Sequence, residues 1–273
     1  MKKQLLHIFS NVPFGRHMLT QSVYFCKKTQ TSLAVHIPKY DQLLMYFEYE
    51  AVTVALNRDF LNSPETAEKH VNEIVRQGGL EPNFVKPVSY TASRLPDIPV
   101  DFEYMSCPRS IGDLSTKINL GHMEATVRNI VKNALFPVLI PTSAYTEWKS
   151  LTVFFDGSQH SVRSMKIGID ISKRSGFPLL VFTHAEKSPR SHYKEIMKKN
   201  ELFEGIRKGE IEWLFFEKGE FSENLYEVPF HSLVITGAYG HGLIKELLFG
   251  SRMEEIHTIL PNNMLIVGPY TTV

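Results

Sequence analysis

The second half of the chain alternates short apolar runs with segments of helical character. Five runs are expected to form strands: Leu151–Phe155, Leu179–Thr183, Glu210–Phe216, Ser232–Thr236 and Met264–Val267. Helices are expected between them, over residues 159–174, 189–206, 220–227 and 252–260. Strands that alternate with helices indicate βαβ units, and nearly continuous apolar strands fit a parallel sheet that is covered on both faces. The pattern therefore predicts a five-stranded parallel sheet of flavodoxin-like or Rossmann-like type.

The first half repeats this plan more weakly. Strands are expected at Leu5–Phe9, Leu33–Ile37, Phe84–Tyr90, Val100–Tyr104 and Pro137–Ile140, with helices over residues 20–28, 64–77 and 123–133. An offset of 146 residues aligns Ser10 with Asp156, and an offset of 129 aligns residues 119–131 with 248–260. A repeat this long indicates tandem duplication of a domain. We therefore expect two α/β domains, residues 1–142 and 147–273.

Composition excludes several classes of function. The 273 residues carry a formal net charge of +1, and basic residues are not concentrated in either half, so a nucleic-acid partner is not expected. Apolar runs fall short of the ~20 residues that a membrane span requires, so we expect no membrane partner and a cytoplasmic location. The two cysteines form no CxxC pair, and the 11 histidines show no HExxH or HxxxH spacing. Neither a disulfide framework nor a metal site is therefore expected.

A glycine pattern in the second half is the strongest functional signal. Gly237 and Gly240 follow an expected strand, and Gly250 and Ser251 precede an expected helix, with nine residues between Gly240 and Gly250. Glycines let main-chain amides approach a bulky anion, and a helix N-terminus adds its dipole and unpaired N–H groups. The pattern predicts a phosphate-binding loop. The alternative is that the glycines only form a turn and Ser251 only caps the helix.

A second group of polar residues follows the first strand of the second half. Asp156, Gly157 and Ser158 come directly after the run that ends at Phe155. Ligands of open α/β sheets bind beyond the carboxyl ends of the strands, so these residues and the glycine loop are expected to face one crevice. The alternative is that Asp156 or Ser158 merely caps the next helix.

These two motifs give the chain a resemblance to the universal stress protein family. The segments VFFDGSQHS (153–161) and GAYGHGLIKELLFGS (237–251) resemble that family's strand-plus-Asp start and its nucleotide signature, Gly-x2-Gly-x9-Gly-Ser/Thr. The likeness covers residues 150–270 by motif and residues 1–141 more weakly, by plan and register. It implies two adenine nucleotide alpha hydrolase-like domains, whose closing strands would pair as an internal pseudo-dimer. A further homodimer and protein partners are left open.

The resemblance also implies a ligand and its contacts. ATP, with Mg²⁺ on its phosphates, would occupy the crevice of the second domain. Phe154, Phe155 and Asp156 would line the adenine and ribose side beside Gly157 and Ser158, and Ala185 would touch the base. Thr236 and Gly237 would meet the ribose. The phosphates would lie among Gly240, Gly250, Ser251, Arg252 and Met253. Arg252 departs from the small or β-branched residues common there; either its charge strengthens phosphate binding or its side chain points away.

The first domain departs further from the family pattern. Ser10 stands at the Asp position, His122 stands at the Ser/Thr position, and the glycine pair is replaced by a segment that contains Pro108. Proline removes a main-chain donor where donors are needed. We therefore expect a degenerate domain that binds ATP weakly or not at all.

The resemblance favours a nucleotide-binding sensor or regulator of the stress response. The sequence assigns no general base, so at most slow ATP hydrolysis is expected. One alternative is an ATP-dependent transferase or ligase that uses the same crevice. Another is a scaffold, or a protein that binds a hydrophobic ligand through residues 39–62. That segment is rich in aromatic and apolar residues and is expected to pack on the sheet as a helix.

Overall fold

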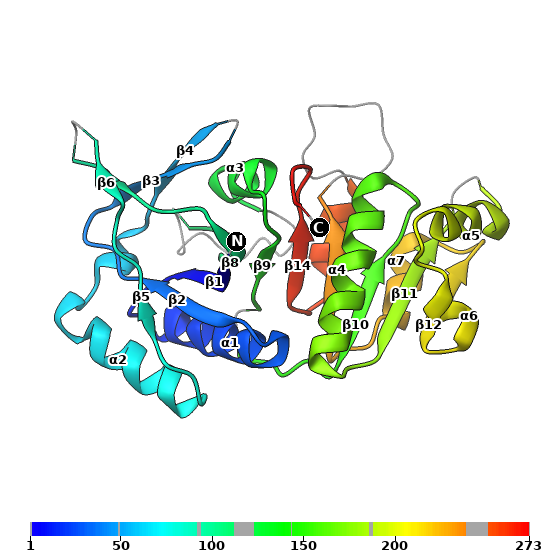
Figure 1. The fold of residues 1–273 in the computed structure, drawn as a ribbon, viewed down its shortest axis with the longest axis horizontal. Coiled ribbons are helices and arrows are strands. Elements are labelled where there is room, and N and C mark those ends of the chain that lie inside the picture. Colours follow the sequence, from blue (N-terminus) through cyan, green and yellow to red (C-terminus); the bar gives the residue numbers. More distant parts are fainter. Residues whose placement is uncertain are drawn as a thin grey trace.

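The computed structural model describes residues 2–48, 50–91, 94–111, 123–142, 144–185, 188–238 and 251–272. For Lys2 and residues 251–254 it describes the backbone alone. The chain folds around one ten-stranded sheet with the order β12-β11-β10-β13-β14-β9-β8-β1-β2-β5. A second sheet of four strands, β4-β3-β7-β6, lies at the end formed by the first half (Figure 1).

The second half contributes five parallel strands to the large sheet, as its sequence predicts. They are β10 (Ser150–Phe154), β11 (Leu179–His184), β12 (Ile211–Phe216), β13 (Ser232–Gly237) and β14 (Met264–Val267). Val153 of β10 lies between Val181 of β11 and Ile235 of β13. Almost every residue of these strands except those of β12 is buried, because helices cover both faces of the sheet.

The first half builds the same strand order. Its strands are β1 (Lys2–Ile8), β2 (Ser32–His36), β5 (Asn83–Phe84), β8 (Phe102–Ser106) and β9 (Val138–Ile140), arranged β5-β2-β1-β8-β9. The expected strand at residues 84–90 is wrong as one element: its start is β5, and its end is β6 (Ser89–Tyr90) of the small sheet. Pro87 interrupts it, because proline cannot donate to a strand ladder.

The closing strands of the two halves pair, as the resemblance implies. β9 and β14 run antiparallel, with Leu139 opposite Leu265 and Ile140 opposite Met264. All of these side chains are buried. The two five-stranded units therefore form a single continuous sheet.

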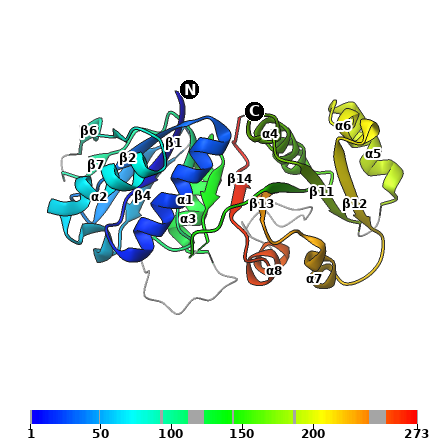
Figure 2. The same cartoon turned by 90° about the horizontal axis from the view of Figure 1, so that it is seen from below.

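Helices cover the two faces of the large sheet (Figures 1 and 2). One apolar core lies under α1 (Pro13–Thr29), α2 (Pro64–Gln77), α4 (Gln159–Ser175), α5 (Arg190–Lys199) and α6 (Glu204–Lys208). On the other face, the core lies under α3 (Ala125–Asn133), α7 (Phe221–Asn224), the 3₁₀ turn η2 (Leu225–Glu227), α8 (Ser251–Ile259) and the small sheet. None of the helices in the described ranges is both long and apolar enough to cross a membrane.

Helix α4 ends within one residue of the expected position, whereas helix α1 begins earlier than expected. Gly176 follows α4 in the left-handed conformation, with φ of 70°, and its N–H bonds to the carbonyl of Ser172. Helix α1 begins at Pro13, seven residues before the expected start at Thr20. Proline is favoured in the first helical turn because its missing N–H is not needed there.

The segment 39–62 is not a helix packed on the sheet, so that expectation is wrong. It forms the antiparallel hairpin β3 (Gln42–Tyr46) and β4 (Ala51–Ala55), followed by the 3₁₀ turn η1 (Arg58–Leu61). β7 (Pro96–Asp97) extends the hairpin on the β3 side. In β4, buried Val52 and Val54 alternate with exposed neighbours. A period of two and β-branched side chains favour a strand with one buried face.

The two halves also share side-chain contacts near the junction at residues 141–149. Trp148 is 1% exposed, and its carbonyl accepts a hydrogen bond from the hydroxyl of Tyr24 at 2.5 Å. Arg174 of α4 forms an ion pair of 2.7 Å with Glu103 of β8, and its main-chain oxygen accepts a bond from Gln30. The two halves are therefore packed against each other.

Candidate functional site

The turn after β10 is held by its own polar side chains. Asp156 Oδ1 accepts a bond of 2.9 Å from the N–H of Ser158, and Ser158 Oγ caps α4 by accepting the N–H of Ser161 at 3.2 Å. Gly157 has φ of 80°, a conformation that favours glycine. Ser158 thus caps α4, one of the alternatives considered from the sequence, and Asp156 holds the amide of this N-cap residue. The same bonds place Asp156 at the end of β10, beside the N-terminus of α4.

The end of β13 lies against this turn. Ser232–Ile235 pair with Ser150–Val153, so Thr236 and Gly237 end at the same edge of the sheet as Asp156. A Cβ at Gly237 would lie 2.8 Å from His160 Cβ in the first turn of α4, a separation that real Cβ atoms essentially never show. Glycine is therefore required for β13 to approach α4 this closely. The structure thus places Gly237, the first residue of the glycine pattern, at the same strand end as the Asp156 turn.

The remaining loop residues are only partly described. Gly240 and Gly250 lie outside the described residues. Helix α8 spans Ser251–Ile259, one residue ahead of the expected range 252–260, and Ser251, Arg252 and Met253 form its first turn. The directions of these three side chains, including the charge of Arg252, lie outside the description.

The two phenylalanines at the end of β10 point to opposite faces. Phe154 packs against Phe182, with ring centroids 4.7 Å apart, and against Phe221 of α7. Phe155 is 1% exposed and belongs to the core on the α4 side. Only the main chain of Phe155 is therefore available to a ligand at the strand end. Ala185 follows β11, and its N–H bonds to the carbonyl of Phe216.

Two histidines near the strand ends were not among the candidates from the sequence. Burial lowers the pKa of His160 below its ordinary value, and the charge of Arg163 lowers it further, while Asp156 opposes the change. His184 ends β11; its ring contacts Phe221, and Nε2 lies 3.1 Å from the carbonyl of Gly219. The position of His160, four residues after Asp156, is a signal that could have identified the first of these.

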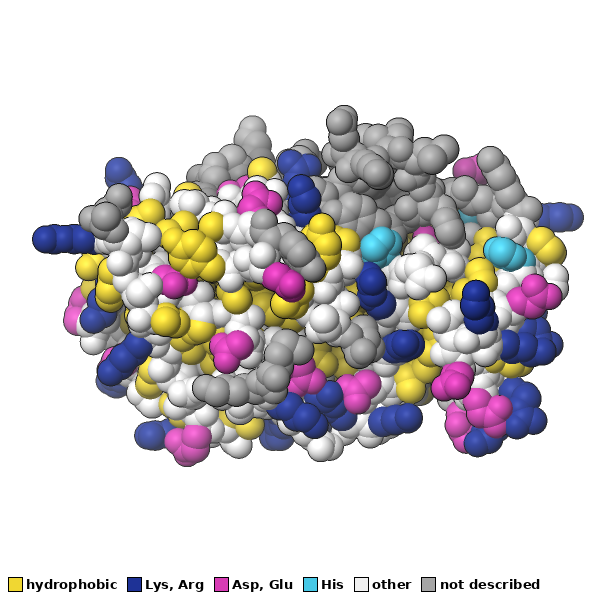
Figure 3. Space-filling model, turned by 45° about the horizontal axis from the view of Figure 1, so that its top comes forward, with side chains coloured by type: hydrophobic (Ala, Val, Ile, Leu, Met, Phe, Trp, Pro, Cys, Tyr) yellow, Lys and Arg dark blue, Asp and Glu magenta, His cyan; other side chains and the backbone are white. Residues whose placement is uncertain are grey.

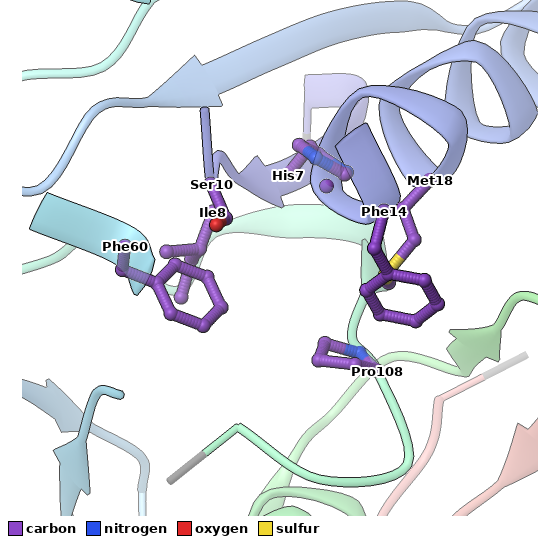
Figure 4. Close-up of a pocket in the computed structure, with 8 residues that line it drawn as sticks. His7, Ile8, Ser10, Phe14, Met18, Phe60 and Pro108 are labelled. Carbon is purple, nitrogen blue, oxygen red and sulfur yellow. The ribbon is translucent and has the colours of Figure 1, made fainter. Parts of the chain in front are cut away.

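The equivalent strand end in the first half is filled. Ser10, aligned with Asp156, is 2% exposed, and its hydroxyl donates to the carbonyl of Asp59 in η1 at 2.9 Å. Phe60 and Phe14 lie on opposite sides of the pocket here, and Pro108 lies beside Phe14 (Figure 4). The cavity left between them has a volume of about 10 Å³, about enough for one water molecule. The inserted segment thus closes this end of the first half.

In the segment after β8, a main-chain N–H and a hydroxyl donate to the carboxylate of Glu124. Glu124 Oε2 accepts the N–H of Ile111 at 2.7 Å and the hydroxyl of Ser110 at 2.8 Å. Glu124 is also the N-cap residue of α3, the helix that aligns with α8. An anionic side chain of the protein therefore lies at the helix N-terminus where the repeat would place a phosphate.

Comparison with known proteins identifies the architecture. Comparisons with protein-family models and with curated protein sequences found no match. Solved structures do match over nearly the whole chain. A universal stress protein from Archaeoglobus fulgidus DSM 4304 has a TM-score of 0.65 at 13% identity, covering 98% of this chain and 99% of that chain. A putative universal stress protein from Pseudomonas aeruginosa UCBPP-PA14 has a TM-score of 0.59 at 12% identity, covering 98% and 94%. A functionally unknown protein, PA1789 from Pseudomonas aeruginosa PAO1, has a TM-score of 0.57 at 12% identity, covering 98% and 93%.

The class of protein follows from these observations. The molecule is an α/β protein in which a large, mostly parallel sheet is flanked by helices. The strand order 3-2-1-4-5 occurs in both halves, and the closing strands pair. This is the fold of the universal stress proteins, and the likeness to the Archaeoglobus fulgidus protein extends over 98% of the chain.

Proposed function

We propose that the second half binds ATP at the carboxyl ends of β10 and β13. One observation carries the proposal: the Asp156–Ser158 turn and Gly237, more than 75 residues apart in sequence, lie at the same edge of the sheet, and a side chain is excluded at Gly237. The pattern Gly237, Gly240, Gly250 and Ser251 then leads into α8. Ligands of open α/β sheets bind at such strand ends.

The chemistry proposed for the site is main-chain recognition of phosphate. Amides of a glycine-rich loop and the N-terminal turn of α8 supply donors and a favourable dipole for a triphosphate. Phe154, Ala185, Thr236 and Gly237 would lie on the nucleoside side. Among the described residues, no three His, Cys, Asp or Glu side chains form a metal-binding group. Mg²⁺ would accordingly be held mainly through phosphate oxygens.

The proposed role is that of a cytoplasmic nucleotide sensor or regulator linked to stress, with ATP hydrolysis slow at most. Asp156, the carboxylate at this strand end, holds the amide of Ser158 through Oδ1. This local bond supports a positioning role in the turn for Asp156. The first half is proposed not to bind ATP, since Ser10 and Glu124 are engaged within the chain.

Calorimetric titration of the full chain with MgATP tests the proposal. Wild-type protein should bind one ATP per chain, and Gly240→Val and Gly250→Val should abolish binding while the circular dichroism spectrum is retained. Gly121→Val is the matched control, because Gly121 aligns with Gly250 in the first half and should leave affinity unchanged. Equal affinity in Gly250→Val and wild type would refute the site. Rapid turnover of the bound ATP would instead support the transferase or ligase alternative.

A further inference from the structure

Helix α5 carries three basic side chains along one face, at the end of the molecule opposite the small sheet (Figure 1). Arg190, Lys194 and Lys198 are spaced four residues apart, so they follow one another along the helix at intervals of about 6 Å. All three residues are exposed, whereas Tyr193 and Met197 of the same helix are buried in the core. The three cations therefore form a line on the uncovered surface of the helix, which we call the α5 stripe.

Each cation of the α5 stripe lies over an aromatic ring. The guanidinium carbon of Arg190 is 4.6 Å from the centroid of the Trp213 ring. The ammonium groups of Lys194 and Lys198 are 5.0 Å and 5.9 Å from the centroid of the Phe203 ring. Attraction to a ring face restricts these long side chains. A partner that binds the stripe therefore has less of the surface to order, and a smaller entropy loss favours binding.

The α5 stripe has no acidic partner within the described part of the chain. Exposed cations of other helices do form ion pairs: Lys69 pairs with Glu73 in α2, and two cations of α6 pair with Glu204. The ion pairs among the described residues include none with the three cations of the stripe. Their positive charge is therefore left for an external anion.

The α5 stripe is also locally unfavourable for its own helix. The first turn of α5 contains Arg190 and no acidic residue, although a helix N-terminus favours negative charge. Lys194 and Lys198 are like charges four residues apart, and such pairs repel each other. Local conflicts of this kind are expected at functional sites. An anion bound along the stripe would relieve both of them.

We propose that the α5 stripe binds an acidic segment of a partner protein, in which carboxylates recur at intervals of about 6 Å. An α-helix with glutamate at every fourth residue has this spacing. Arg190 can donate two parallel hydrogen bonds to one carboxylate, and the ammonium groups of Lys194 and Lys198 can each donate to another. Binding of such a segment requires no nucleotide.

Exposed carboxylates limit the width of this partner. Glu195 lies on α5 directly after Lys194, and Glu201 follows the helix with its N–H bonded to the carbonyl of Lys198. Charged side chains of both signs lie exposed at this end of the molecule (right in Figure 3). A membrane surface or a nucleic-acid duplex is broad enough to meet these carboxylates, which would repel it. A single peptide segment can contact the stripe alone.

Fluorescence anisotropy of labelled peptides at low ionic strength tests the surface. The probe is an alanine-based peptide with glutamate at every fourth residue, and the control peptide carries glutamine at those positions. The full chain should bind the glutamate peptide about tenfold or more tightly than the glutamine peptide, and added salt should weaken this binding. Equal affinity for the two peptides would overturn the proposal.

Paired substitutions separate the α5 stripe from general electrostatic attraction. Lys194→Gln with Lys198→Gln should weaken binding of the glutamate peptide by about tenfold or more. Lys69→Gln with Lys199→Gln is the matched control, because it removes the same charge from exposed positions outside the stripe. An equal loss in the two double variants would contradict the assignment. Binding of phosphatidylserine vesicles that only the first double variant abolishes would assign the stripe to a membrane instead.

Charge reversal provides a gain of binding, which a loss of folding cannot imitate. Lys194→Glu with Lys198→Glu should no longer bind the glutamate peptide, and it should bind a peptide that carries lysine at the same positions. If this variant binds the lysine peptide no more tightly than the wild type does, the proposal is wrong.

Trp213 reports where the peptide binds. It lies under Arg190 and is partly exposed, whereas the other tryptophan, Trp148, is 1% exposed. Unlabelled glutamate peptide bound along the α5 stripe should therefore protect the tryptophan emission from quenching by acrylamide. Unchanged quenching at saturating peptide would place the bound peptide elsewhere on the molecule.

Discussion

The guanidinium of Arg109 donates a hydrogen bond of 3.0 Å to the main-chain oxygen of His257. Arg109 follows β8 in the first half, and His257 lies in the last turn of α8 in the second. A cation at the C-terminal turn of a helix is favourable, because unpaired carbonyls and the helix dipole concentrate negative potential there. The first half therefore helps to hold the helix whose first residue, Ser251, is proposed to meet the phosphates of ATP.

Replacement of Arg109 should weaken the fold. Arg109→Ala leaves the carbonyl of His257 without its charged donor, and hydrogen bonds to charged groups contribute about 1.5–3 kcal/mol. The free energy of unfolding, measured by urea titration, should fall by about that amount. Arg76→Ala is the control, since the Arg76–Glu81 pair is exposed and should contribute less than about 1 kcal/mol. Equal small losses in both variants would show that the Arg109 contact does not stabilise the protein.

Acid should destabilise the protein in part through His257. This residue is 3% exposed, neither ring nitrogen has a hydrogen-bond partner among the described residues, and burial lowers its pKa to about 3, with the charge of Arg109 lowering it too. The imidazole of His257 is protonated near pH 6.5 in the unfolded chain but only near pH 3 in the folded chain. Stability is therefore lost as the pH falls through this window. One such group should lower the free energy of unfolding by about 1 kcal/mol between pH 7 and 5.5.

The variant His257→Leu isolates this contribution. Urea titrations at the two pH values should give a smaller difference for His257→Leu than for wild type, by about 1 kcal/mol. His192→Leu, at an exposed position of α5, should keep the wild-type difference. Burial likewise lowers the pKa of His7 to about 3, so part of the pH dependence should persist in His257→Leu. An unchanged pH dependence in His257→Leu would contradict the assignment.

The ion pair between Glu103 and Arg174 should contribute more than the pairs on the surface. Its two side chains are 19% and 18% exposed, and it joins β8 of the first half to α4 of the second. Glu103→Ala leaves Arg174 paired with Asp170 alone on the carboxylate side. A loss of about 1–3 kcal/mol in the free energy of unfolding is expected. Glu204→Ala, which removes exposed pairs with Arg207 and Lys208, should lower the free energy of unfolding by less than Glu103→Ala does, because water screens exposed pairs; a larger loss in Glu204→Ala would refute the difference.

Restoration of the missing carboxylate in the first half should not create a second ATP site. Ser10→Asp would bury a charge at a position that is 2% exposed and replace a donor to the carbonyl of Asp59 with an acceptor. The variant should be destabilised by about 1–3 kcal/mol, and titration should still give a single ATP per chain. Stoichiometry of two in Ser10→Asp would show that Phe60 and Glu124 do not block the crevice.

Much of the architecture could be predicted from local pattern. The runs ending at Phe155, Thr183 and Thr236 were identified as strands because each is short, apolar and followed by a helical segment. The repeat offset correctly placed Ser10 and Asp156 at equivalent strand ends. The hairpin at residues 39–62 could not be separated from a helix by its aromatic content, because short apolar segments fit both periods. In β4, the alternation of buried and exposed residues emerged only from packing against the large sheet.

Some features of the candidate site could likewise be predicted from the sequence, and others depend on tertiary packing. The glycine spacing and the Asp156 turn are visible in the chain, whereas the burial of Phe155 depends on which face of β10 meets α4. The engagement of Glu124 by Ile111 and Ser110, and the closure of the first-half pocket by Phe60, join residues that no short motif connects.

The sequence by itself determined the βαβ plan of the two halves, because periodicity and turn chemistry act over neighbouring residues. The tertiary structure decided that the strand end of the first half is filled by Phe60 and Phe14. It also decided that the halves share one sheet through Leu139 and Leu265 and that Arg109 reaches α8. These outcomes depend on long-range packing, where burial of apolar surface and pairing of buried polar groups select among arrangements that local pattern leaves equal.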